Sequence, residues 1–243
     1  MSPFTTLVAA ELRKLLTIRT ALWFALGSVA LAGLNAVIVG LASGTLDEVG
    51  EKEEALGGMP VLLLFFGLVT VTAEWRHHTA APAVLLSGRS PRAVTVARLT
   101  ATTIVGIGLA LLTIGAACAA AVPILDIHQP GPALTTAQIL SVAGGSALAG
   151  ALSVMLGAAL GGLLRNQILA IVTGVVLYFI APSLIGMVDA SAVDDTPFGG
   201  LQVLTRGVHG ASHSLLASGF ALVVWALGLA LIAVLAEDRR DLV

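Results

Sequence analysis

Six stretches of the chain, each about as long as a membrane-spanning helix, contain no Asp, Glu, Lys or Arg. A helix needs about 20 apolar residues to cross a ~30 Å hydrocarbon core. The sequence has no amphipathic helices or alternating strands that could cover six such helices in a soluble protein. We therefore predict an all-α integral membrane protein with a single domain over 1–243. Its six transmembrane helices are expected near 20–42, 56–73, 100–123, 138–164, 167–188 and 214–236.

The composition agrees with a membrane protein and excludes other classes. Hydrophobic residues make up 57% of the chain and charged residues 11%, far from the roughly 25% charged residues of soluble domains. The net charge of −2 provides no basic surplus to neutralise phosphates, so we exclude nucleic acid as a partner. The one cysteine, Cys118, can form neither an internal disulfide nor a thiolate zinc cluster. The first apolar stretch exceeds the core of a secretory signal, about 7–15 residues, so we predict a retained span.

Basic residues gather on one side of the predicted topology. Ten of the 12 Lys and Arg residues fall before span one, between spans two and three, between spans four and five, or after span six. The other side holds Lys52 and Arg206 together with most of the acidic residues. Because basic loops stay in the cytoplasm, we predict a multi-pass protein of the inner (plasma) membrane with both termini cytoplasmic.

The predicted spans lack the groups that power transport by themselves. An ionisable residue within a span marks a proton or ion pathway, and the six predicted spans contain none. Neither Lys14 nor Lys52 lies in the G-x-x-x-x-G-K-[ST] loop that binds nucleotide phosphates. We therefore predict no cofactor in this chain; if it moves something uphill, the work must come from another polypeptide that docks on the cytoplasmic face.

An intramembrane protease is the enzymatic alternative. The sequence GGSA, Gly144 to Ala147, in span four is similar to the G-x-S-G serine motif of rhomboid-type proteases. Such a serine needs a histidine base at the same depth, but all five histidines lie in predicted loops or at their edges. We therefore predict that the chain is not an enzyme.

Small residues recur every four positions along span four, the small-xxx-small pattern that lets helix backbones approach closely. Because four residues advance about 400° around a helix, the row drifts about 40° per step and suits a right-handed crossing. The partner helix belongs either to the same subunit, which we favour, or to a second one. The row consists of Gly145, Ala149, Ser153, Gly157 and Gly161.

The N-terminal segment, 1–19, is predicted to form an amphipathic helix that lies in the cytoplasmic interface. Its apolar residues follow helical spacing, and its polar side carries Glu11, Arg13 and Lys14. A frayed tail that only keeps positive charge inside is the alternative.

The connection between spans two and three, 74–98, is the longest on the cytoplasmic side and is too charged for a simple turn. We predict a short helix, a break over Gly88 to Pro91, and a second helix that leads into span three. The neighbouring His77 and His78 project about 100° apart on a helix and have no further ligand at metal spacing. We interpret them as interface residues and predict no metal site here.

The segment AEWRHHT (73–79) ends span two, and LLSGRSPR (85–92) and the pair Ala97-Arg98 follow before span three. Their order resembles the cytoplasmic loop of ABC-2-type transporter permeases, where an acidic-aromatic-Arg-x-x-Thr stretch precedes a Pro-Arg turn and an Ala-Lys pair. The segment 157–167, which ends in LRNQ, is similar to the junction between spans four and five of that family. The resemblance extends over the whole chain, including its size and its six spans.

The resemblance implies a permease that lacks its own ATPase. Two permease chains, identical or related, would work with two P-loop nucleotide-binding subunits that bind ATP and Mg²⁺. The loop after span two would be a coupling helix seated in a cleft of the ATPase. Its Glu and Arg side chains are expected on the exposed face; a solvated loop that only obeys the positive-inside rule is the alternative. Arg98 stands where the family often has lysine, and the His77-His78 pair is unusual there. The coupling residues carried over are Glu74, Trp75, Arg76, His77, Thr79, Arg89, Arg92 and Arg98.

The outer connection between spans five and six, 189–213, is predicted to include a short re-entrant helix. This follows from the near-helical spacing of Phe198, Leu201, Leu204 and Val208, and permeases of the resembling family have such a helix.

Two outer features could attract cations. His209 and His213 are four residues apart, the spacing that places two imidazoles on one helical face, but Gly207 and Gly210 weaken a helix there. We favour two ordinary loop histidines. We also favour a solvated loop for the acidic run 47–54 over a cation-collecting mouth.

Spans that are poor in polar side chains suit an apolar or amphipathic cargo. We therefore predict that the chain exports a drug, antibiotic, lipid or peptide, powered by the partner ATPase. The competing interpretation is a non-transporting membrane scaffold that anchors or assembles partners.

Overall fold

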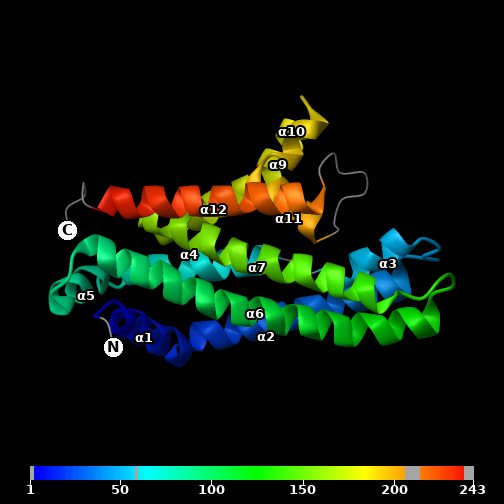
Figure 1. Cartoon of the computed structure of the whole chain (residues 1–243), viewed down its shortest axis with the longest axis horizontal. Helices are drawn as coiled ribbons and strands as arrows, with labels where there is room; N and C mark the ends of the chain where they lie inside the picture. The colour runs from blue at the N-terminus through cyan, green and yellow to red at the C-terminus, as the bar shows by residue number, and fades with distance from the viewer. Residues whose placement is uncertain (1–2, 58–59, 206–213, 238–243) are drawn as a thin grey trace.

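The computed structural model describes residues 3–57, 60–205 and 214–237, and every regular element in these ranges is a helix. Figure 1 shows the long helices lying side by side. The elements are α1 (Pro3–Thr17), α2 (Arg19–Val37), the π-helix η1 (Ile38–Ala42), α3 (Val49–Leu56), α4 (Val61–Arg76), α5 (Ala80–Ser87), α6 (Pro91–His128), α7 (Thr136–Leu164), α8 (Gln167–Val175), the π-helix η2 (Val176–Ile180), α9 (Ala181–Gly186), α10 (Ala190–Asp194), α11 (Pro197–Leu204) and α12 (Leu215–Glu237).

Six helical segments are long and apolar enough to cross a membrane, as the sequence predicts. The predicted ends differ most at the second and third spans. Helix α4 begins at Val61 and runs on to Arg76, and α6 extends from Pro91 to His128. At 1.5 Å per residue, the 38 residues of α6 extend about 57 Å. This helix is therefore far longer than a ~30 Å hydrocarbon core.

The central pair of the bundle is α4 and α7. Helix α6 lies beside both, α1 and α2 lie along α6, and α12 packs against α7 (Figure 1). Among the candidate spans, those that contain α4 and α7 are the most buried. In an apolar 18-residue stretch of each, 69% and 61% of the residues are buried, whereas the share in the span Gln167–Gly186 is 17%. The peripheral helices α2, α8 and α12 expose large apolar side chains, as expected of helices that meet lipid or another membrane-embedded chain.

The two ends of the bundle differ in charge. One end holds α1, α5 and the C-terminal end of α12, and the other holds α3 and the connection between α6 and α7 (Figure 1). We call the first the basic end because most of the basic residues lie in its helix ends and connections; we call the second the α3 end. The basic residues of the basic end within the described ranges are Arg13, Lys14, Arg19, Arg76, Arg89, Arg92, Arg98 and Arg165.

The row of small residues on α7 lies against other helices of the same chain. Gly157 faces the backbone of α4 so closely that a Cβ atom there would strike the carbonyl oxygen of Leu64, and Gly161 likewise faces the carbonyl of Leu68. Further along, Gly145 faces the carbonyl of Leu204 in α11. The remaining two members, Ala149 and Ser153, are fully buried, and the Ser153 hydroxyl donates to the Ala149 carbonyl at 2.7 Å. Dispersion contacts between backbones at this range hold membrane helices together without a hydrophobic driving force.

The α3 end is more ordered than the predicted solvated acidic loop. Residues Val49–Leu56 form α3, which begins with a capping box between Glu48 and Glu51. The helix packs its apolar side on α6 and α7. This turns Lys52 inward: its side chain is 2% exposed, and its ammonium donates to the Pro132 carbonyl at 3.2 Å. The prediction of a loop over 47–54 is therefore wrong for α3, because an amphipathic helix gains apolar burial that a loop does not. The acidic side chains of this run are exposed or half-exposed, in line with the predicted solvation.

Gln129 joins three segments at the α3 end. Its side-chain amide donates to the carbonyls of Gly40 at 2.6 Å and Gly44 at 3.0 Å, and its carbonyl oxygen accepts from the Leu46 backbone at 2.8 Å. These bonds satisfy backbone groups that the π-helix η1 and the following loop leave unpaired.

Gln129→Ala is expected to destabilise the purified protein by about 1–2 kcal/mol, since net contributions of single hydrogen bonds are about 1 kcal/mol and part of this site is open to water. Thermal unfolding in detergent measures the effect, and Gln202→Ala, on the half-buried side of α11, serves as the control. Equal stability of wild type and Gln129→Ala would contradict the assignment of a joining role to this residue.

The connection between α9 and α12 contains two short helices. Helix α11 buries Phe198, Leu201 and Leu204 against α7 and α12, so the helical spacing in the sequence corresponds to a packed helix. Val208, the fourth residue of the predicted re-entrant helix, and His209 and His213 lie outside the described residues.

Candidate functional site

The connection between α4 and α6, residues 77–90, protrudes at the basic end. Residues that end one helix and begin the next define its conformation. Helix α4 ends at Arg76, and His78 then adopts a left-handed conformation with φ 54°. The Thr79 backbone donates to the Glu74 carbonyl at 2.9 Å, which closes the turn. Helix α5 follows directly.

The second half of the turn fixes the start of α6. Gly88 ends α5 with φ 60°, a conformation that glycine adopts without strain. The Ser90 hydroxyl then accepts a hydrogen bond from the Ala93 backbone at 3.3 Å, and Pro91 occupies the first turn of α6. The short helix, the break and the second helix thus lie where the sequence predicts them. Both ends of α5 are short turns, so α5 is connected directly to the end of α4 and the start of α6.

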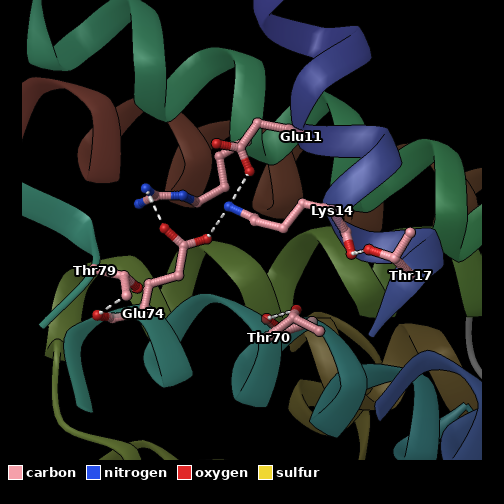
Figure 2. A network of polar contacts seen from close by, with 8 residues as sticks. Glu11, Lys14, Thr17, Thr70, Glu74 and Thr79 are labelled. Carbon is pink, nitrogen blue, oxygen red and sulfur yellow. Dashed lines mark hydrogen bonds and ion pairs between the residues drawn. The ribbon is translucent and has the colours of Figure 1, made fainter. Parts of the chain in front are cut away.

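Glu74 does not lie on an exposed face, which corrects the expectation from the sequence. It belongs to the last full turn of α4 and is only 9% exposed. Its carboxylate contacts the Lys14 ammonium of α1 at 2.6 Å and the Arg98 guanidinium of α6 at 2.5 Å. Figure 2 shows Glu11, Lys14 and Glu74 pointing toward one another, and Glu11 also pairs with Lys14. The Glu74 carboxylate therefore links α1, α4 and α6 at the basic end of the bundle.

Arg98 is the most buried member of this network, at 5% exposed. It lies within α6 rather than before it, because α6 starts at Pro91, nine residues earlier than the predicted span. The predicted spans contain no ionisable residue, but the helices that form them are longer and include Arg98 and Glu74. A charge buried to this degree is tolerated when an opposite charge compensates it, and the two acids and two bases of the network balance: Glu11, Lys14, Glu74 and Arg98.

Helix α1 is amphipathic as predicted, but only some of its polar residues are exposed, and others point into the bundle. Leu15 is buried against α4 and α6, with Val8 and Leu12 packed beside it. Lys14 and Glu11 turn toward the ion-pair network, whereas Arg13 is exposed. The polar residues of α1 therefore bind the bundle and do not only face water.

A second cluster links the ends of α4, α7, α8 and α12. Arg165, the residue after α7, pairs with Glu237 at 3.0 Å, and its guanidinium carbon lies 4.0 Å above the centre of the Trp75 ring. The Arg76 guanidinium donates to the Gln167 side chain at 3.0 Å. Cation–π stacking of this kind is worth about 0.5–2 kcal/mol. Glu237 and Gln167 are members that sequence reasoning did not identify as site residues.

The tip of the protrusion is apolar and exposed. Helix α5 carries no charged residue, and its Leu85 and Leu86 are 71% and 88% exposed. Arg89 and Arg92, which follow α5 in the chain, are exposed. His77, His78 and Thr79, which precede α5, are exposed as well. The charged face that the sequence predicts for this helix is therefore a pair of leucines bordered by arginines. Two adjacent exposed leucines next to arginines are typical of a protein or membrane contact.

Across the described ranges, no three His, Cys, Asp or Glu side chains converge on a point where a metal ion could bind. The exposed tip connects through short turns to a buried network that spans α1, α4 and α6.

Comparison with models of known protein families gives no match to this chain, and comparison with curated proteins gives no significant match.

Proposed function

We propose that this chain is the permease subunit of an ABC exporter, and that a separate P-loop ATPase binds its basic end and supplies the energy. The observation that carries the proposal is the connection between α5 and the buried ion-pair network. The exposed leucines of α5 provide an apolar surface for the binding of a water-soluble partner. Glu74, at the base of the same turn, contacts α1 and α6 directly. A displacement of α5 would therefore move α1, α4 and α6 together.

The distribution of charge supports a cytoplasmic position for this end. Eight described basic residues gather at the basic end, and Lys52 is the described basic residue of the α3 end. By the positive-inside rule, the basic end faces the cytoplasm, where ATP is available. A second permease chain would complete the transporter.

An apolar or amphipathic cargo fits the cavities of the bundle. A cavity of about 260 Å³ lies between η2, α9, α11 and α12 and is lined almost entirely by apolar side chains, among them Pro182, Phe198 and Trp225. A groove of about 430 Å³ between α6 and α12 is also mainly apolar, with Met155 of α7 in its wall. Drugs, antibiotics, lipids and hydrophobic peptides have the chemistry that such surfaces bind.

Site-specific crosslinking tests the docking surface. In a Cys118→Ala background, Leu86→Cys at the tip of α5 is expected to crosslink to a protein with a P-loop, identified by mass spectrometry. Ile127→Cys, at a position that is also highly exposed (76%) but lies at the α3 end, is the matched control and should not crosslink to it. If Leu86→Cys gives the same products as Ile127→Cys, the proposed docking surface is wrong. A partner at Leu86→Cys that lacks a P-loop would instead favour the scaffold interpretation.

Leu86→Ser is expected to weaken the affinity of the ATPase about 10- to 100-fold, because burying a leucine side chain contributes about 1.5–3 kcal/mol. Leu16→Ser on α1, which removes a 70% exposed leucine outside the tip, should leave affinity unchanged. Titration of the purified ATPase onto the permease in detergent measures both values. Equal affinity for Leu86→Ser and wild type would contradict a contact at the tip.

A further inference from the structure

A polar cavity of about 410 Å³ lies at the basic end between the end of α4 and the junction of α7 and α8. It differs from the two apolar cavities in its chemistry, because its wall combines two guanidinium groups, two amides and an indole and, among the described residues, includes no acidic side chain. The lining residues are Trp75, Arg76, Arg165, Asn166, Gln167, Ile168 and Ile171.

The two arginines of the cavity are held in different ways. Arg165 is fixed by its ion pair with Glu237 and by stacking on Trp75. Arg76 is exposed, and the polar partner that the structure gives it is the neutral amide of Gln167. Within the described part of the chain Arg76 has no acidic partner, so the cavity presents its positive charge next to a second guanidinium of fixed position. Guanidinium groups bind phosphate through two parallel hydrogen bonds.

The start of α8 strengthens the preference for an anion. This nine-residue helix begins at Gln167, with the Asn166 side chain accepting from the Leu169 backbone at 3.0 Å. The partial positive charge of a helix N-terminus adds to the charge of the two arginines.

The surface below the cavity is apolar, which distinguishes a lipid from a soluble anion. Along α8, Ile168, Leu169 and Val172 are 77%, 51% and 53% exposed. Trp75 lies beside the cavity, and tryptophan is the residue that favours the level of lipid headgroups. A ligand with a phosphate and hydrocarbon chains would place the phosphate between the arginines and its chains along α8.

We propose that this cavity binds the phosphate headgroup of an anionic phospholipid. The assignment depends on the cavity and on α8 and does not depend on the proposed transport function. Basic pockets between membrane helices at the cytoplasmic surface are a known setting for such headgroups.

Native mass spectrometry of the full-length protein in detergent tests the proposal, with phosphatidylglycerol as the anionic probe and phosphatidylcholine as the zwitterionic one. Wild type is expected to retain phosphatidylglycerol in preference to phosphatidylcholine. Arg76→Gln should weaken phosphatidylglycerol binding about tenfold and leave phosphatidylcholine binding unchanged. Arg89→Gln, which removes the same charge from an exposed position outside the cavity, is the matched control and should bind as wild type does.

Three results would overturn the proposal. Equal retention of the two lipids by wild type would mean that the cavity does not select an anionic headgroup. Equal losses in Arg76→Gln and Arg89→Gln would mean that diffuse surface charge attracts the lipid. Displacement of phosphatidylglycerol by millimolar inorganic phosphate, with phosphate bound as tightly as the lipid, would mean that the cavity is a site for free anions.

Discussion

Glu74→Gln is expected to lower the stability of the purified protein by about 3–5 kcal/mol, the cost of leaving a buried charge without its partner. Arg98 is 5% exposed, and its guanidinium contacts the Glu74 carboxylate at 2.5 Å. A neutral glutamine keeps the shape of the side chain but removes the charge that compensates Arg98. Thermal unfolding in detergent, followed by tryptophan fluorescence, measures the loss.

Lys14→Gln is the matched control for this experiment. Lys14 contacts the same carboxylate, but its side chain is 40% exposed, so water screens the pair and its contribution is expected to be below about 1 kcal/mol. The order of stability should therefore be wild type, then Lys14→Gln, then Glu74→Gln well below both. Equal effects of the two substitutions would contradict the assignment of Arg98 as the partner that makes Glu74 indispensable.

Arg98→Met in the Glu74→Gln background extends the test. If the loss in Glu74→Gln comes from an uncompensated buried charge, removing that charge should recover part of the stability, since apolar replacements of buried ion pairs are often neutral. Failure of the double substitution to recover any stability would indicate that the loss has another cause, such as altered packing of α1.

Gly157→Leu is expected to destabilise the central helix pair by about 3 kcal/mol. A Cβ atom at Gly157 would strike the carbonyl oxygen of Leu64, and this atom belongs to the backbone of α4, so it cannot turn away as a side chain can. The substitution therefore separates α4 from α7. The expected result is a lower melting temperature and a lower yield of monodisperse protein.

Gly144→Leu on the same helix is the control, because a Cβ atom there meets nothing within 4 Å. It adds the same side chain and removes the same glycine from α7. We expect it to retain most of the stability of the wild type. A loss as large as that of Gly157→Leu would mean that glycine is needed along α7 for a reason other than close contact with α4.

The six spans could be predicted from the sequence because their signal is local and long. A charge-free stretch of about 20 residues has few folding options other than a membrane-spanning helix. The ends of the helices were less predictable, since apolar composition indicates what can lie in lipid and does not indicate where a helix stops. Glu74 and Arg98 show the consequence: both were expected in the connection outside spans two and three, and both lie within the spanning helices, which continue past the apolar stretch.

The ion-pair network could not be predicted from spacing. Lys14 and Glu74 are 60 residues apart, and the contact between them depends on α1 folding back along α6. A partial signal was available, because an acid and an arginine at the same predicted membrane boundary tend to pair when buried. Lys52 could not be placed from its sequence neighbours either. Its acidic neighbours predicted an exposed loop, but α3 packs its apolar side on the bundle and thereby buries Lys52.

The proposed transport function is tested most directly by purifying the chain from its native host in mild detergent and measuring which proteins and what ATPase activity accompany it. Our account predicts a P-loop ATPase in about equal amount, with hydrolysis that falls in Glu74→Gln and persists in Lys14→Gln. If no P-loop ATPase accompanies the wild-type chain, even after crosslinking in intact membranes, the permease assignment is contradicted.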